Sequence, residues 1–146
     1  MIKDIVVPLA GTAEDESRLV WAEAIARLFD GHVTGLQIHP MPEVIAITEP
    51  TGSAFLQSLL EVSAKEASEV AARLTERLGR LGVANSLRRL DVYQASKGSE
   101  LAAAARCADL YVDLRPYGDA PSTSAASETV MFTSGRACLF VPRAKA

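Results

Sequence analysis

Short apolar segments rich in β-branched residues alternate along the chain with segments of helical spacing, and this alternation restricts the fold more than any other feature. Five segments have the length and composition of strands: 2–9, 32–39, 87–93, 109–114 and 137–142. Four helices are expected between them: 12–31, 54–81, 98–107 and 127–134. Strands separated by helices pair in parallel through right-handed crossovers, with helices on both faces. The pattern therefore predicts a doubly wound α/β fold.

Composition narrows the class of protein. The chain has 146 residues, of which 49% are hydrophobic, so we expect a single domain over 1–146 with a substantial core. A net charge of -3 argues against nucleic acid as a partner, because phosphate binding needs a basic surface. The sequence has no apolar run of about 18 residues, the length that a membrane-spanning helix needs.

The N-terminal residues and the cysteines indicate a cytoplasmic protein. Asp4 interrupts the stretch that a signal peptide would keep apolar. The two cysteines, Cys107 and Cys138, match no metal or redox spacing, and we expect both to be reduced and buried.

Signals at the helix ends and on the helix faces refine this outline. Thr12 and Asp15 have the spacing of a capping box, and Gly31 is expected to end the first helix. The segment 40–53 is long for a connection and is interpreted as a covering loop. The expected inner stripe of the longest helix is Leu56, Leu59, Leu60, Ser63, Ala67, Val70, Ala71, Leu74, Leu78 and Leu81.

A ligand site is expected where the first and fourth strands end. In doubly wound sheets, ligands bind beyond the carboxyl ends of the strands, at the point where the strand order changes direction. Those ends are 8–11 and 114–117. A phosphate there needs main-chain N–H groups that converge at a helix N-terminus, and glycines let the backbone come close enough.

Four segments resemble the universal stress protein family. They are Ile5–Thr12 (IVVPLAGT), Thr34–His39 (TGLQIH), Ala108–Val112 (ADLYV) and Ala137–Pro142 (ACLFVP), and the resemblance extends over essentially the whole chain. It implies a Rossmann-like, adenine nucleotide alpha hydrolase-like fold with strand order 3-2-1-4-5. It also implies dimers, often joined by pairing of the last strands.

Many members of that family bind ATP, and this sequence departs from their motif. The family carries an Asp after strand one, where this chain has Ala10. It also carries Gly-x2-Gly-x9-Gly-Ser/Thr after strand four. Here the first glycine is replaced by Leu114, the second by Pro116 or Tyr117, and the third by Ala126, which Ser127 follows.

These departures predict that ATP does not bind in the family manner. Leu114 places a branched side chain where the backbone should approach a phosphate. Pro116 has no N–H group to donate. Asp113, Asp119 and Glu128 are expected to bring negative charge close to a triphosphate. We therefore expect no bound cofactor.

An alternative is that AMP, ATP or another small anion binds in a variant mode. The candidate pocket is formed by Leu9, Ala10, Gly11, Arg115, Tyr117 and Ser127. Each polar member has a simpler interpretation. Arg115 would be a solvated surface arginine, Tyr117 would cover the edge of the core, and Ser127 would be a helix N-cap.

The sequence predicts neither a catalytic nor a metal site. A metal site is not expected, because Cys107 and Cys138 lie far in sequence from His32 and His39. A catalytic Cys–His pair is not expected either, because nothing suggests an orienting acid or an oxyanion hole. A nucleotide hydrolase or transferase is the weakest hypothesis, because the P-loop pattern GxxxxGK[ST] is absent.

The last strand is the expected interface between two copies of the chain. An apolar edge strand invites pairing with another chain, and the family uses this strand for dimers. The residues expected at the interface are Cys138, Leu139, Phe140 and Val141. Trp21 is expected in the core or in an interface. The sequence thus predicts a non-catalytic cytoplasmic homodimer, and the resemblance to universal stress proteins implies a role in stress tolerance.

Overall fold

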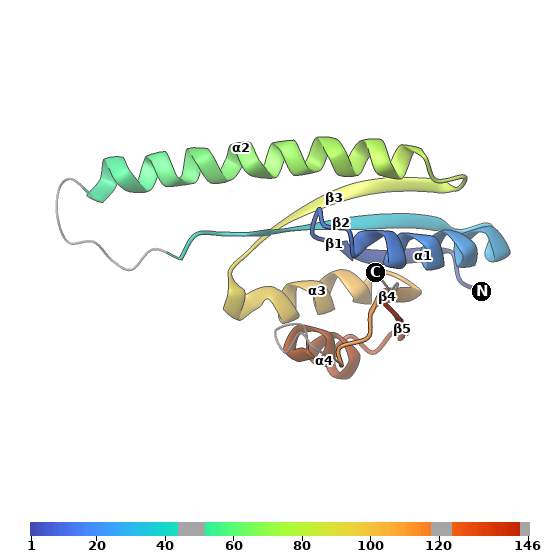
Figure 1. Ribbon diagram of the computed structural model, residues 1–146. Helices are drawn as coiled ribbons and strands as arrows, with labels where there is room; N and C mark the ends of the chain where they lie inside the picture. The colour runs from blue at the N-terminus through green and yellow to red at the C-terminus, as the bar shows by residue number, and fades with distance from the viewer. Residues whose placement is uncertain (44–51, 118–123, 144–146) are drawn as a thin grey trace.

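Five parallel strands form one sheet at the centre of the molecule (Figure 1). The computed structural model describes residues 1–43, 52–117 and 124–143. The strands are β1 (Asp4–Leu9), β2 (His32–Pro40), β3 (Ala84–Val92), β4 (Leu110–Leu114) and β5 (Ala137–Val141). Their order is β3-β2-β1-β4-β5, and every neighbouring pair is parallel. The prediction of a doubly wound sheet in the order 3-2-1-4-5 is confirmed.

Helices cover both faces of this sheet. They are α1 (Asp15–Phe29), α2 (Gly52–Gly79), α3 (Lys97–Arg106) and α4 (Ser124–Thr133), and a 3-10 turn (Gln94–Ser96) precedes α3. One core lies between the sheet and α1 and α2, and a second lies between the sheet and α3 and α4. Side chains alternate in direction along a strand, so in β1 Ile5 and Val7 enter the first core and Val6 enters the second.

The ends of α1 differ from the predicted ones. The prediction of a capping box from Thr12 to Asp15 is wrong. The helix α1 begins at Asp15, and Glu14 at the N-cap makes no side-chain capping bond. At the other end Asp30, not Gly31, adopts the left-handed conformation, with φ of 52°. Gly31 still closes the helix by donating its N–H to the carbonyl of Ala26.

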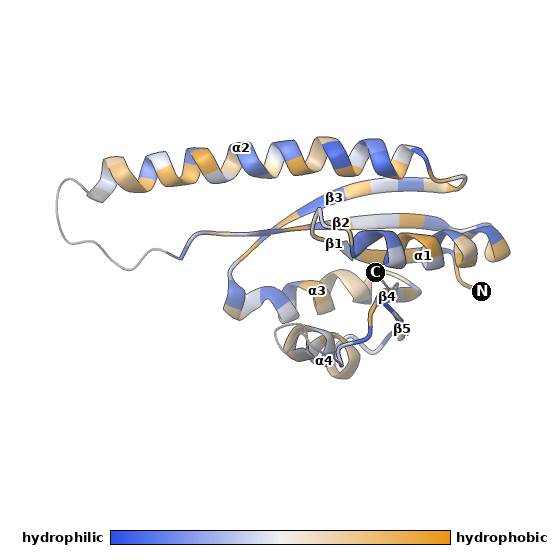
Figure 2. Ribbon diagram, viewed as in Figure 1, coloured by the Kyte–Doolittle hydropathy of each residue, from blue (hydrophilic) through white to orange (hydrophobic). Residues whose placement is uncertain are grey.

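The inner stripe of α2 is mostly as predicted. Leu74, Leu78 and Leu81 are buried, but Leu60 is 40% exposed, so its assignment to the stripe is wrong. The first turns of α2 extend beyond the end of β3, where no strand lies beneath them (Figure 1). Polar and apolar residues alternate along the whole helix (Figure 2).

The structure describes both ends of the predicted covering loop at 40–53. Pro40 ends β2, the N–H of Met41 donates to the carbonyl of Val92, and Ser53 lies in α2. Residues 44–51 lie outside the described part of the chain. Within that part, no helix is long and apolar enough to cross a membrane.

Candidate functional site

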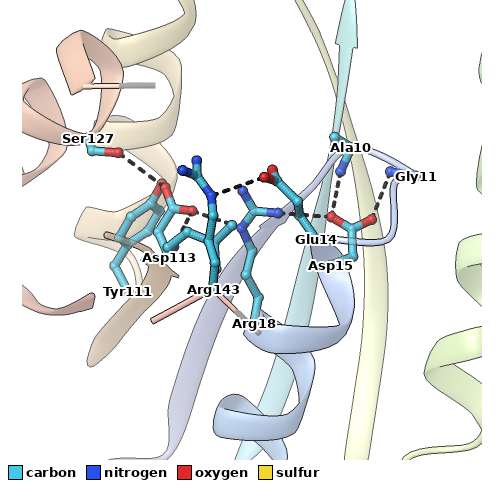
Figure 3. Close-up of polar contacts among 10 residues, drawn as sticks. Ala10, Gly11, Glu14, Asp15, Arg18, Tyr111, Asp113, Ser127 and Arg143 are labelled. Atoms are coloured by element: carbon cyan, nitrogen blue, oxygen red, sulfur yellow. Dashed lines mark hydrogen bonds and ion pairs between the residues drawn. The ribbon is translucent and has the colours of Figure 1, made fainter. Parts of the chain in front are cut away.

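A buried ionic cluster lies where β1 and β4 end (Figure 3). Arg18 of α1 donates from Nε to Oδ1 of Asp113 at 2.8 Å and from Nη1 to Oδ1 of Asp15 at 3.1 Å. Arg18 is 6% exposed, and Asp15 and Asp113 are each 4% exposed. The cluster is therefore shielded from solvent and holds two carboxylates against one guanidinium.

Further donors complete the bonding of both carboxylates. Asp15 accepts the main-chain N–H groups of Ala10 and Gly11, at 3.1 and 2.8 Å. Asp113 accepts the Tyr111 hydroxyl at 3.0 Å and the Ser127 hydroxyl at 3.3 Å. A buried network whose carboxylates are bonded in this way fixes the elements that contribute to it. Here it joins the end of β1, the start of α1, β4 and α4.

The phenol of Tyr111 stays protonated within this cluster. Burial raises the pKa of Tyr111 well above its usual range, and the neighbouring Asp113 carboxylate raises it further. The hydroxyl is therefore fixed as a donor to Asp113.

An open cavity adjoins the cluster. It has a volume of about 280 Å³. Its apolar lining comes from Pro8, Leu9, Ala10, Ile38, Pro40, Val92, Leu101 and Ala126. Its polar lining comes from Arg18, Gln94, Lys97, Asp113 and Ser127. The cavity thus lies at the carboxyl edge of the sheet, where the sequence predicts a ligand site.

The structure places five of the six predicted pocket residues along two separate spaces. Leu9 and Ala10 line this cavity, whereas Arg115 and Tyr117 line a separate hollow with Glu128, Met131 and Phe140. Both Arg115 and Tyr117 are exposed. Ser127 borders both spaces, and Gly11 borders neither.

Ser127 is not the helix N-cap that its sequence position suggested. The helix α4 begins at Ser124, so Ser127 lies in its first turn. Its side chain is buried and donates to Asp113.

The main-chain donors at the end of β4 are already used. The N–H of Leu114 donates to Oδ1 of Asp113 at 2.7 Å, and the N–H of Arg115 donates to the carbonyl of Val141 at 2.9 Å. Pro116 has no N–H. The side chain of Leu114 is fully buried in the core beneath α1. Residues 114–116 therefore offer no main-chain N–H to a phosphate.

Sequence reasoning missed Arg18 and misread the role of Asp113. The sequence analysis considered Asp113 only as negative charge close to a triphosphate, whereas in the structure it is the buried ion-pair partner of Arg18. Two signals were available: an acid inside the apolar run of the fourth strand, and an arginine one position before Leu19 on the inner face of the first helix.

Neither histidine bonds a member of the ionic cluster, whereas Cys138 lies opposite Tyr111 in the sheet and close enough to Asp113 to feel its charge. His32 and His39 each bond a serine hydroxyl, that of Ser86 at 2.8 Å and that of Ser63 at 2.7 Å. Among the described residues, no three His, Cys, Asp or Glu side chains are grouped as metal ligands. Cys107 is exposed, which contradicts its expected burial. Cys138 is half-buried, and burial raises its thiol pKa.

Gly11 is a position where the backbone itself requires glycine. Its φ is 78°, and an added Cβ would lie 2.8 Å from Cγ1 of Val70. We expect Gly11→Ala to lower the free energy of unfolding by about 2 kcal/mol, measured by urea denaturation. Gly135 is the matched control: its φ is 67°, but nothing lies within 4 Å of an added Cβ. Gly135→Ala should therefore lower the free energy of unfolding by about half as much, because only backbone strain contributes. Equal losses would contradict a role for the Val70 contact.

No family model and no curated protein matches the chain. Solved structures match it over nearly its whole length. The hypothetical protein MJ0577 superposes with a TM-score of 0.73 at 17% identity, covering 100% of this chain and 99% of that one. The universal stress protein UspA from Lactobacillus plantarum superposes with a TM-score of 0.68 at 14% identity, covering 96% of this chain and 97% of that one.

A third similar structure was solved with a ligand. The universal stress protein from Archaeoglobus fulgidus, in complex with dAMP, gives a TM-score of 0.55 at 16% identity, covering 97% of this chain and 99% of that one. The identities are low, and the agreement lies in the order and packing of the elements. The chain therefore has the fold of the universal stress proteins.

Proposed function

We propose that the chain is a universal stress protein that works in the cytoplasm as a non-catalytic homodimer in stress tolerance and does not hold ATP in the family manner. The fold and the four sequence segments that resemble the family support the first part. One observation supports the second part, that ATP is not held in the family manner: residues 114–116, at the end of β4, present no unused main-chain N–H.

The ionic cluster supports the same conclusion. A triphosphate at the ends of β1 and β4 would approach Asp113 and Asp15, whose two charges exceed the single charge of Arg18. Like charges repel strongly in a partly buried site. The A. fulgidus protein was solved with dAMP, so the fold is compatible with a nucleotide. We infer that this chain uses the same edge of the sheet differently.

Exposed apolar side chains beside β5 support the homodimer. On the side of α1, Val20 and Trp21 are 57% and 46% exposed, and they line a hollow with Pro142. On the side of α4, Met131 and Phe132 are 38% and 78% exposed. Apolar surface on both sides of an edge strand favours burial against a second copy. We propose that the strand formed by Cys138, Leu139, Phe140 and Val141 pairs antiparallel with its equivalent.

Thermal denaturation with ATP and Mg²⁺ tests the proposal on ligand binding. A ligand present at 100 times its dissociation constant adds about 2.7 kcal/mol of stability, which would be visible as a rise in melting temperature. We expect no rise with ATP, and no release of phosphate above the buffer rate. A saturable rise would contradict the proposal. Its loss in Arg115→Ala would then place the nucleotide in the hollow beside Tyr117, which is the variant mode of binding.

A further inference from the structure

Lys97 has no evident structural role. It is the first residue of α3 and borders the cavity next to the ionic cluster. It makes no hydrogen bond or ion pair with any residue in the described ranges. A positive charge at a helix N-terminus is also unfavourable, because the helix dipole is positive there. The side chain therefore brings an uncompensated cation to the cavity wall.

Arg18 brings a second unused donor to the same cavity. Its Nε and Nη1 bond Asp113 and Asp15, but Nη2 has no hydrogen-bond partner among the residues that the structure describes (Figure 3). Arg18 is only 6% exposed and borders the cavity. Among the described residues, Nη2 is not one of the buried polar atoms that lack a partner, so it remains reachable from the open cavity, where an acceptor on a ligand can bond it.

The charges around the cavity limit what this ligand can be. Arg18 is already paired with both Asp15 and Asp113, so Lys97 is the cation of the described cavity wall that has no acidic partner. A triphosphate would add several negative charges without compensation. A single negative charge could instead approach Lys97 while the ion pairs of Arg18 remain intact.

The rest of the wall is apolar. Pro8, Ile38, Val92 and Leu101 contribute to it, and the volume of about 280 Å³ suits a small molecule. We infer that the cavity binds a small amphipathic mono-anion. Its one acidic group contacts Lys97 and Nη2 of Arg18, and its apolar body lies against these side chains. This inference rests on one part of the proposed function, namely that the site does not hold a triphosphate.

A matched pair of probes tests the inference. We would titrate 2-naphthoate and its neutral analogue 2-naphthamide into the full chain, with ligand-detected NMR as the readout. Lys97→Met should weaken naphthoate binding about tenfold or more, as expected from losing a hydrogen bond to a charged group. The same change should leave naphthamide binding within about twofold of wild type, since the amide carries no charge. Lys97→Arg should retain naphthoate binding.

Lys65→Met is the control for a general loss of positive charge, because Lys65 is exposed on α2, away from the cavity. It should not change naphthoate binding. Circular dichroism will verify that each variant is folded. The inference is overturned if naphthoate does not bind saturably, or if Lys97→Met weakens both probes equally. A thermal shift with ATP would count against the proposed function instead, so the two failures are distinguishable.

Discussion

Replacing Arg18 with methionine is expected to lower the free energy of unfolding by about 3–5 kcal/mol. Methionine fills a similar apolar volume, so the loss comes from the charge. Without the guanidinium, Asp15 and Asp113 remain buried with no counter-charge, and removing one partner of a buried ion pair is far more damaging than removing both. Urea denaturation will measure the difference.

Arg77→Met is the matched control. Arg77 also forms an ion pair, with Glu16, but its side chain is 26% exposed and that of Glu16 is 56% exposed. Solvent screens such a pair, so we expect a loss of at most about 1 kcal/mol.

A double variant separates charge from packing at the Arg18 site. Arg18→Met combined with Asp113→Asn should recover part of the loss, because one of the two unpaired carboxylates is then removed. Strictly additive losses, or an Arg18→Met loss no larger than that of Arg77→Met, would contradict the role assigned to the cluster.

Replacing Cys138 with proline is expected to convert the proposed dimer into monomers. The N–H of Arg115 donates to Val141, so Val141 directs its main-chain groups toward β4. Alternate residues of a parallel strand face opposite neighbours, which places the N–H of Cys138 at the outer edge of β5. Proline removes that N–H without removing a bond to β4.

Each copy would lose one bond across the two-fold axis and leave one acceptor unpaired. At about 1–3 kcal/mol for each unsatisfied group, the dissociation constant of the dimer should rise about 30-fold or more. Analytical ultracentrifugation will report the change. Cys138→Ala is the control and should remain dimeric, since it keeps the main chain intact. A wild-type chain that sediments as a monomer would refute the proposed interface, as would a proline variant that stays dimeric.

The fold was predictable because it depends on periodicity. Apolar residues at strand and helix spacing were enough to locate all five strands, with ends that differ by at most three residues. The strand order was not contained in that pattern and came from the resemblance to a family. Leu60 was misassigned because periodicity identifies a helix face but not where the sheet beneath it ends.

The candidate site was predictable only in part. Its position followed from the ends of β1 and β4, and Leu114 and Pro116 could be identified as departures from a glycine motif. The pairing of Arg18 with Asp113 could not be predicted, because the two residues lie 95 positions apart and only the packing of α1 against β4 brings them together. The use of the Arg115 N–H by β5 is likewise a consequence of tertiary structure.

A crystal structure determined with ATP and Mg²⁺ in excess tests the central claim most directly. Our interpretation predicts that Arg18 still pairs with Asp113, that the N–H groups of Leu114 and Arg115 keep their present acceptors, and that no nucleotide lies at the end of β4. A triphosphate bound there by the main-chain N–H groups of these two residues would contradict it.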